Sequence, residues 1–178
     1  VLSFAVCGEG GRTLAEATSE FRNLPVPPEG NLALAATGAT VQSDSSYSEY
    51  RPEVTIDGVW ETTGLHWTQR AWASRDAATE DGHWLEITLP KPTAVSSLLV
   101  YWAIDDNHVF SSRNCDVELW DGKAWKAAAQ VRDNPVSTVS RFTWPGQVTD
   151  KVRLHQLKSG GAAVRPDIMW VSEVCLYP

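Results

Sequence analysis

The chain has 178 residues, enough to bury the core of one domain, and its 43% hydrophobic and 21% charged residues are typical of a globular protein. The formal net charge of −7 argues against a nucleic-acid partner, because phosphates attract clustered Lys and Arg. No apolar run reaches the roughly 18 residues needed to span a bilayer, which excludes a transmembrane segment. Nine Trp are unusually many, so we expect most to pack in the core and two or three to be available for binding.

Residues 1–30 differ in pattern from the rest of the chain. The start lacks an initiator Met and a basic leading segment, which indicates a processed or internal start. Residues 14–22 predict a short helix with Thr13 as its N-cap, and the proline-rich run 25–30 predicts a linker or strap. We therefore expect an N-terminal arm over residues 1–30 and one domain over residues 31–178.

From Asn31 onward, short alternating runs separated by turn residues predict β-strands. Asp121-Gly122 predicts a tight hairpin turn, because Gly tolerates positive φ. No alternation of strands and long helices is present, which disfavours a parallel sheet. We predict an all-β antiparallel sandwich with strands at Trp84–Leu89, Ser96–Trp102, Cys115–Trp120, Ala124–Val131, Thr138–Thr143, Lys151–Leu157 and Trp170–Tyr177.

The three Cys have no metal-type spacing, and an odd count permits one disulfide with one thiol left over. Cys115 alternates with Val117 and Leu119, so we interpret it as a small buried hydrophobe. Cys175 points away from its neighbours in the last strand, which allows it to meet Cys7 outside the core. A Cys7–Cys175 disulfide would imply an oxidising compartment.

No sequence motif supports catalysis, and we predict that the chain is not an enzyme. The four His have no zinc-binding spacing, and a Gly-x-Ser-x-Gly nucleophile motif is missing. The Gly-rich segment 158–162 has its Lys before the glycines, which favours a flexible turn over a phosphate-binding loop. A facing carboxylate pair, such as Asp81 and Glu61, remains an open alternative.

Several short motifs follow one another in a recognisable order. They are Asn31–Ala35, Ile56-Asp57-Gly58, Trp67, Trp84–Leu89, Val100-Tyr101-Trp102, Val117–Trp125, Val152-Arg153-Leu154 and Val171–Val174. This ordered set resembles the galactose-binding-like or discoidin (coagulation factor type C) family. Within that family it is most similar to the bacterial carbohydrate-binding modules attached to glycoside hydrolases, where a Val-Tyr-Trp strand precedes acidic residues and a Ser-Arg loop.

The resemblance implies an eight-stranded jelly-roll β-sandwich over residues 31–178, with ligand loops at one rim. It also implies a structural Ca²⁺ beside the Asp-Gly loop, held by Asp57, Thr62 (or its neighbour Thr63) and Glu173 with backbone carbonyls. Such hard oxygen ligands suit Ca²⁺. The alternative is that Asp57-Gly58 is only a turn and Glu173 only an ion-pair partner.

The resemblance places the ligand on loops that contain aromatic and polar side chains, as sugar binding requires. It assigns Trp67 and Trp84 to the core. Among the other Trp residues, we expect Trp102, Trp120 and Trp125 to pack and Trp60 and Trp72 to stack on a ligand. Alternatives stay open: His108 lies in a polar turn that could be merely solvated, and Arg113 could pair with Asp105 or Asp106. The predicted ligand-binding residues are His66, Arg70, Trp72, Asn107, His108, Phe110, Arg113 and Arg165.

The sequence therefore predicts a non-catalytic carbohydrate-binding module of a larger secreted protein, tethered to a catalytic domain. Two other functions are retained as alternatives. The first is a discoidin-type domain that binds protein or lipid, which would need long hydrophobic side chains on the rim loops. The second is a structural domain that supports a neighbouring glycoside hydrolase without a ligand of its own.

Overall fold

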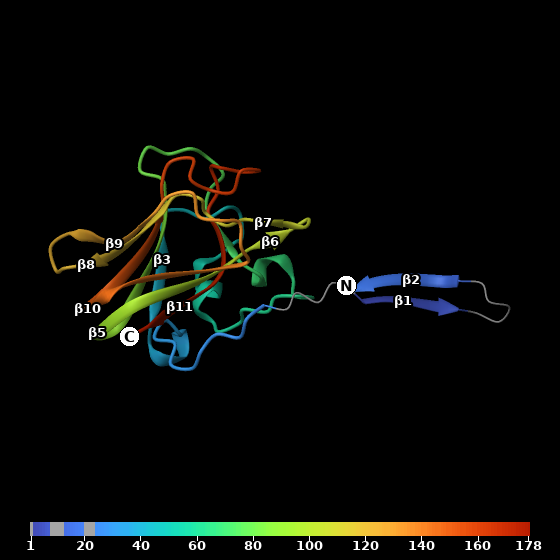
Figure 1. Ribbon diagram of the computed structural model, residues 1–178, viewed down its shortest axis with the longest axis horizontal. Helices are drawn as coiled ribbons and strands as arrows, with labels where there is room; N and C mark the ends of the chain where they lie inside the picture. Colours follow the sequence, from blue (N-terminus) through green and yellow to red (C-terminus); the bar gives the residue numbers. More distant parts are fainter. Residues whose placement is uncertain (1, 8–12, 20–23) are drawn as a thin grey trace.

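The computed structural model describes residues 2–7, 13–19 and 24–178, and it is built almost entirely of antiparallel strands (Figure 1). Its helices are three short 3-10 turns, and among the described residues no helix is long and apolar enough to cross a bilayer. The elements are β1 (Leu2–Cys7), β2 (Thr13–Ser19), η1 (Ala35–Thr37), β3 (Thr40–Ser43), η2 (Pro52–Ile56), η3 (Trp67–Gln69), β4 (Trp72–Ala73), β5 (His83–Trp102), β6 (Ile104–Asp105), β7 (His108–Val109), β8 (Cys115–Trp120), β9 (Trp125–Val131), β10 (Val139–Gln156) and β11 (Trp170–Tyr177).

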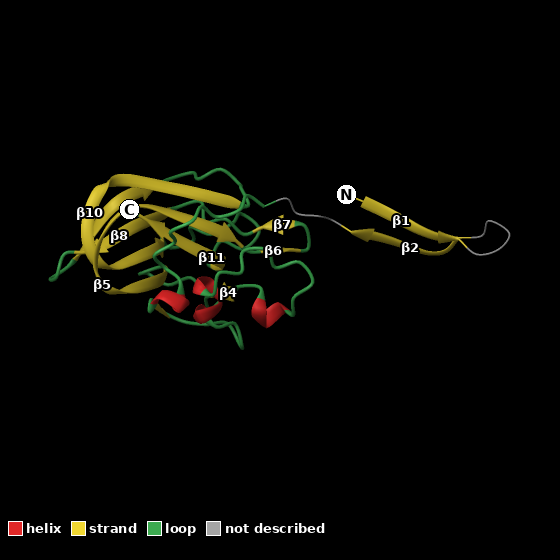
Figure 2. Cartoon of the chain, turned by 90° about the horizontal axis from the view of Figure 1, so that it is seen from below, coloured by secondary structure: helices red, strands yellow, loops and turns green. Residues whose placement is uncertain are grey.

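Seven strands form one continuous sheet in the order β4-β11-β5-β10-β8-β9, with β3 also paired to β5. The long strands β5 and β10 curve around one side of the molecule, so the sheet folds over into two layers (Figure 2). Residues 83–88 of β5 pair with residues 151–156 of β10 in the first layer, next to β3 and β8. Residues 93–101 pair with residues 139–149 in the second layer, next to β11. The antiparallel β-sandwich is confirmed.

Prolines explain why each long strand was predicted as two shorter ones. Pro90 and Pro92 lie in the middle of β5, and Pro145 lies in β10. Because Pro donates no backbone hydrogen bond, the ladder between β5 and β10 shifts register between Thr143 and Gln147. The chain bends at these positions and continues into the other layer.

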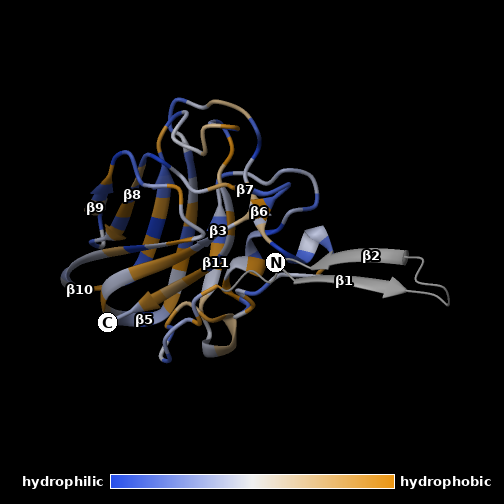
Figure 3. Ribbon diagram, turned by 45° about the vertical axis from the view of Figure 1, so that its right-hand side comes forward, coloured by the Kyte–Doolittle hydropathy of each residue, from blue (hydrophilic) through white to orange (hydrophobic). Residues whose placement is uncertain are grey.

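The core lies between the two layers and is supplied by alternate residues of each strand (Figure 3). In β5, Leu85 and Ile87 face it in the first layer, and Leu98, Val100 and Trp102 face it in the second. Cys115 is a buried free thiol in this core, as predicted. The Asp121-Gly122 turn is also confirmed: Gly122 has φ 92°, and the Asp121 N–H bonds to the Ala124 carbonyl at 3.2 Å.

Residues 24–31, the strap, cover the outer face of the second layer. The Tyr101 hydroxyl donates to the Pro25 carbonyl at 2.7 Å, and the Tyr177 hydroxyl donates to the Pro28 carbonyl at 2.9 Å. Asn31 accepts from the Leu176 N–H at 2.9 Å. The strap therefore closes over a second apolar cluster that contains Leu99, Tyr101, Cys175 and Tyr177.

Two predictions for the N-terminal arm are wrong. The segment predicted as a helix forms strand β2, because Thr13–Ser19 pairs in antiparallel register with Leu2–Cys7; its residues 20–22 lie outside the described part. Cys175 carries a free, buried thiol, so the predicted Cys7–Cys175 disulfide is not formed. Cys175 does alternate away from the main core, but the strap covers it.

Candidate functional site

Both ends of β5 lie at the same end of the sandwich, because the strand turns back at its prolines. We call this end the rim; its loops connect β3 to β4, β4 to β5, β5 to β8 and β10 to β11. A shallow cavity of about 30 Å³ lies where β5 ends and β11 begins. It is lined by Tyr50, Thr62, Trp67, Arg70, Ala71, Ala103, Ile104, Asp105, Trp170 and Ser172.

Aromatic rings form one side of this rim cavity. Tyr50 lies between Trp67 and Trp170, with ring centroids 4.9 Å and 5.6 Å away. Trp67 is 39% exposed, so part of its ring is open to solvent. The indole N–H of Trp170 is buried and has no hydrogen-bond partner among the described residues, a situation that native proteins usually avoid. The cavity thus offers a stacking surface.

Charged groups of both signs line the same cavity. Arg70 donates from Nε to the Leu65 carbonyl at 2.6 Å, which fixes the guanidinium at the mouth. Asp105 is exposed on β6. Burial raises the pKa of Tyr50, and the Asp105 carboxylate raises it further, which places Asp105 in electrostatic contact with the aromatic wall.

Four predicted ligand residues lie at or beside this cavity. Arg70 lines it, and His66 lies against Trp67 with ring centroids 5.3 Å apart. The His66 side chain also caps η3, with Nδ1 2.8 Å from the Thr68 hydroxyl. Asn107 and His108 are exposed in the β6–β7 hairpin that carries Asp105. Their roles in binding remain predictions.

The other four predicted ligand residues have partners within the chain. Trp72 is fully buried and donates from Nε1 to the Ser45 carbonyl at 3.1 Å, so its assignment as a stacking residue is wrong. Phe110 is 6% exposed and packs on Trp170, so its predicted stacking role is wrong for the same reason. Arg113 bonds to the Gly161 carbonyl at 2.8 Å, and Arg165 pairs with Asp76 at 2.5 Å.

Several other Trp assignments also change. Trp67 is predicted to be in the core but is exposed, whereas Trp72 on β4 is packed in the core. Trp84 is only partly buried. Trp60 lines a second cavity, of about 190 Å³, between the strap and Glu173. Neither Tyr50 nor Trp170 is among the predicted ligand-binding residues. The cluster of Tyr and Ser at residues 45–50 was the sequence signal that could have indicated Tyr50.

Two carboxyl groups interact electrostatically where the resemblance implies Ca²⁺. Glu173 is fully buried: Oε1 accepts from the Gly58 N–H at 3.2 Å, and Oε2 has no partner among the described residues. Burial, followed by the nearby Asp57 carboxylate, raises the pKa of Glu173 to about 9. Burial also raises the pKa of Asp57. An orphaned buried oxygen beside a second carboxylate fits a cation with hard oxygen ligands.

The third Ca²⁺ ligand that the resemblance implies is a hydroxyl group, from Thr62 or Thr63. Thr62 lines the rim cavity together with Ser172, the neighbour of Glu173. Thr63 instead donates from its hydroxyl to Glu61 at 2.6 Å, which favours Thr62 of the two predicted hydroxyls.

The fold can be compared with known proteins. No family model matches the sequence, and no curated protein matches it either. Solved structures do match. The family 32 carbohydrate-binding module from C. perfringens NanJ, in complex with galactose, superposes with a TM-score of 0.66 at 14% identity, over 83% of this chain and 98% of the module. The chain has a galactose-binding-like fold. This confirms the fold that the resemblance predicts.

Two further structures support the same fold. A Streptococcus pneumoniae fucose-binding module matches with a TM-score of 0.62 at 18% identity, over 83% of this chain and 94% of the module. Chitosan-binding module 2 from a chitosanase/glucanase of Paenibacillus sp. IK-5, in complex with chitotriose, matches with a TM-score of 0.62 at 16% identity, over 83% of this chain and all of the module. These proteins bind different sugars on one shared framework.

Proposed function

We propose that this chain is a non-catalytic carbohydrate-binding module that binds a glycan at the rim cavity. The observation that carries the proposal is the exposed indole of Trp67 beside Tyr50, Trp170 and Arg70. Aromatic faces contact the C–H faces of sugars, while a few fixed polar groups select hydroxyl positions. The bound sugars of the structural neighbours support the same ligand class.

The side chains that were candidates for the lipid-binding alternative do not project from the rim. That function needs long hydrophobic side chains projecting from the rim, and the sequence offered Trp60, Trp72, Val109 and Phe110. Trp72 and Phe110 are buried in the structure, and Trp60 and Val109 are partly buried. A structural role without a ligand would leave the exposed indole of Trp67, beside Tyr50 and Arg70, without a purpose.

Titration calorimetry tests the proposal with galactose, GalNAc-β-1,3-galactose, chitotriose and the Lewis b antigen as probes. We expect one of them to bind and Trp67→Ala to weaken that binding at least about tenfold, because a stacked indole is lost. Val148→Ala, which removes another exposed hydrophobic side chain at the strand bend, is the matched control. Unchanged affinity in Trp67→Ala would show that the glycan binds elsewhere.

We also propose that Asp57, Thr62 and Glu173 hold a structural Ca²⁺ with backbone carbonyls. The bound ion would offset the repulsion between the Asp57 and Glu173 carboxylates and fix the loop that carries Thr62 to the rim cavity. At a Ca²⁺ concentration 100 times the dissociation constant, binding would stabilise the fold by about 2.7 kcal/mol.

Thermal unfolding with Ca²⁺ and with a chelator tests this site. We expect Ca²⁺ to raise the Tm of the native chain, the chelator to reverse the rise, and Glu173→Gln to abolish it. Glu53→Gln, at an exposed position of η2, should keep the full response. If Ca²⁺ does not change the Tm of the native chain, the proposed Ca²⁺ site is contradicted. Glu173 would then be a protonated buried acid.

A third proposal concerns the larger protein that contains this module. We infer that the module belongs to a larger secreted carbohydrate-active protein and lies beside a catalytic domain, as the chitosanase/glucanase origin of one neighbour supports. The full gene sequence tests this directly. A reading frame that encodes no hydrolase or lyase domain beside these residues would contradict it.

A further inference from the structure

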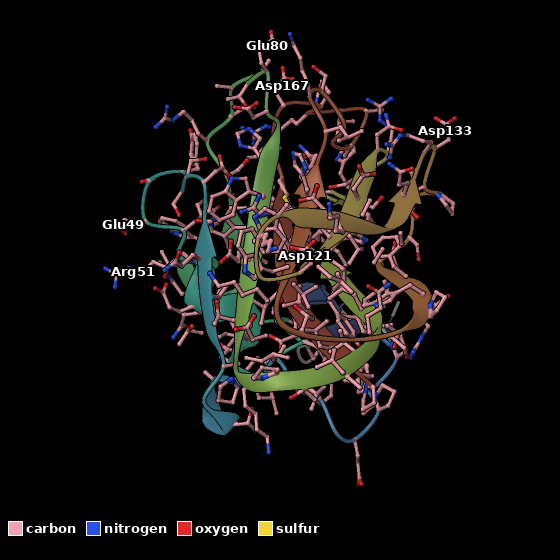
Figure 4. The ribbon with its side chains drawn as sticks, turned by 90° about the vertical axis from the view of Figure 1, so that its left-hand side faces the viewer. Glu49, Arg51, Glu80, Asp121, Asp133 and Asp167 are labelled. Carbon is pink, nitrogen blue, oxygen red and sulfur yellow. The ribbon has the colours of Figure 1, made fainter. Side chains whose placement is uncertain are left out.

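The two outer faces of the sandwich differ in what covers them. The strap covers the second layer, but the outer face of the first layer has no such cover among the described residues. We call this surface the open face; it belongs to β3, residues 83–88 of β5, residues 151–156 of β10, β8 and β9. Asp121, labelled in Figure 4, marks the turn between its last two strands.

Aromatic residues from three strands meet on the open face. The guanidinium of Arg153 lies 4.6 Å from the ring centroid of Trp84 on β5 and 4.0 Å from that of Trp125 on β9. Trp120 on β8 lies 5.4 Å from Trp125. All three Trp are partly exposed, so a third of the nine indoles lie on one surface that the core does not use. With Arg153 they form a cluster that draws on four neighbouring strands.

The charges on the open face are paired with one another. Glu86 binds both Lys151 and Arg153 at 3.0 Å. Glu118 faces Arg153 and His155, and Asp116 on the same strand binds Arg132 at 2.6 Å. Each of these charges therefore has a partner of opposite sign, and the face is nearly neutral in a molecule whose net charge is −7. Such a surface gives little electrostatic attraction to an ionic partner.

We propose that the open face is a second glycan-binding surface, which takes an uncharged polysaccharide chain lying across β5, β10, β8 and β9. The indoles would contact sugar rings, and the partly exposed ammonium of Lys151, already paired with Glu86, would hydrogen-bond hydroxyls without bringing net charge. The Trp84 and Trp125 rings both lie within 4.6 Å of the Arg153 guanidinium, and Trp120 lies 5.4 Å from Trp125, so the cluster offers contacts to a short run of linked sugars. The surface is separate from the rim cavity and contributes no residue to it.

Native affinity electrophoresis in gels that contain soluble polysaccharide tests the proposal. The probes are xyloglucan, galactan and arabinoxylan, with polygalacturonate and chitosan as charged comparisons. We expect at least one neutral polymer to retard the chain, and the double variant Trp84→Ala/Trp125→Ala to weaken that retardation about tenfold. The same variant should keep its calorimetric affinity for the short rim ligand. Val148→Ala is again the control for losing an exposed hydrophobic side chain.

The outcomes separate this surface from the rim site. If Trp67→Ala removes binding of short sugars but leaves polymer retardation, both sites stand. If only the double Trp variant loses retardation and Trp67→Ala changes nothing, the open face stands and the rim proposal fails. Equal retardation of the native chain and the double variant overturns the open-face site. So does a native chain that no neutral polymer retards.

A measurement on the native chain covers the case in which the double variant does not fold. The indole N–H signals of Trp84 and Trp125 are followed by NMR while the retarding polymer is added, and single Trp→Phe variants assign them. Movement of both signals at polymer concentrations that cause retardation supports the site. Unmoved signals overturn it, as does sedimentation that shows the face buried against a second copy of the chain.

Discussion

His83 illustrates how a single side chain holds the rim loops together. Its Nδ1 lies 2.8 Å from the Asp44 carboxylate, and its Nε2 lies 3.0 Å and 3.1 Å from the carbonyls of Ala77 and Asp167. Both ring nitrogens face only acceptors, so both must donate and the ring is a cation. One imidazolium thereby joins three of the four rim loops. Glu80 and Asp167 project at the same end of the molecule (Figure 4).

This contact makes rim stability depend on pH. Burial alone would lower the pKa of His83, but the Asp44 hydrogen bond and charge and the two carbonyls raise it overall. A raised pKa stabilises the fold fully below the unfolded value of about 6.5, and that stabilisation is lost as pH rises through the folded value. Urea unfolding of the native chain between about pH 5 and pH 9 should show this loss, and His83→Gln should show a smaller one, because Glu173 and His155, whose pKa values are also raised, keep their own contributions.

His108→Gln is the control for this prediction, because His108 is exposed and its ring lies 2.8 Å from the Asp106 carbonyl rather than beside a carboxylate. The same loss of stability in His83→Gln as in the native chain would assign the pH dependence to another group.

Asp44 affects the stability of the fold at acidic pH. Burial would raise its pKa, but hydrogen bonds from His83, Trp84 and Ser45 lower it overall, so its contribution disappears only below the ordinary value of 3.8.

Trp67 and Trp72 show what the sequence could not decide at the residue scale. Both lie in a polar stretch five residues apart, and neither is part of an alternating run long enough to assign a face. The unusually long loop after Asp57 allowed either indole to fill the core position. Pairing of Trp72 with Val171 settled the choice, and this contact joins segments that are far apart in the sequence.

At the scale of elements, the strap is a segment that hydrogen bonds hold against the outer face of the second layer. It is fastened to the second layer by the hydroxyls of Tyr101 and Tyr177 and by Asn31. Beneath it lies Cys175, whose pKa burial raises to about 12, so the thiol is unreactive while the strap is closed. The reactivity of Cys175 therefore reports opening of the strap.

Tyr101→Phe/Tyr177→Phe should loosen the strap without emptying the space that the rings fill. Each lost hydrogen bond removes about 1 kcal/mol, so local opening should become about 30 times more frequent. Labelling with a thiol reagent, followed by peptide mass spectrometry, should show Cys175 reacting faster by a similar factor. Cys115, buried in the main core, is the internal control. An equal rise at Cys115 would indicate global unfolding instead.

At the scale of the whole molecule, the fold was predictable because its signals are local and repeated. Alternation within single strands placed residues such as Leu98 in β5 and Leu154 in β10 in the core before any pairing was known. No such alternating pattern marks the residues that line the rim cavity. Tyr50, Thr62, Asp105 and Trp170 come from four separate segments, and only the pairing of β5, β4 and β11 brings them together.

The position of β11 has a consequence for synthesis of the protein. This strand lies between β4 and β5, all eight of its residues are buried, and every other strand of the sheet precedes it in the chain. During translation, residues 1–169 can therefore leave the ribosome while one edge of β5 is still unpaired and the apolar side chains that β11 covers are exposed. Exposed strand edges promote association between chains. The nascent domain is thus most prone to aggregate in the interval before residues 170–177 emerge and insert between β4 and β5.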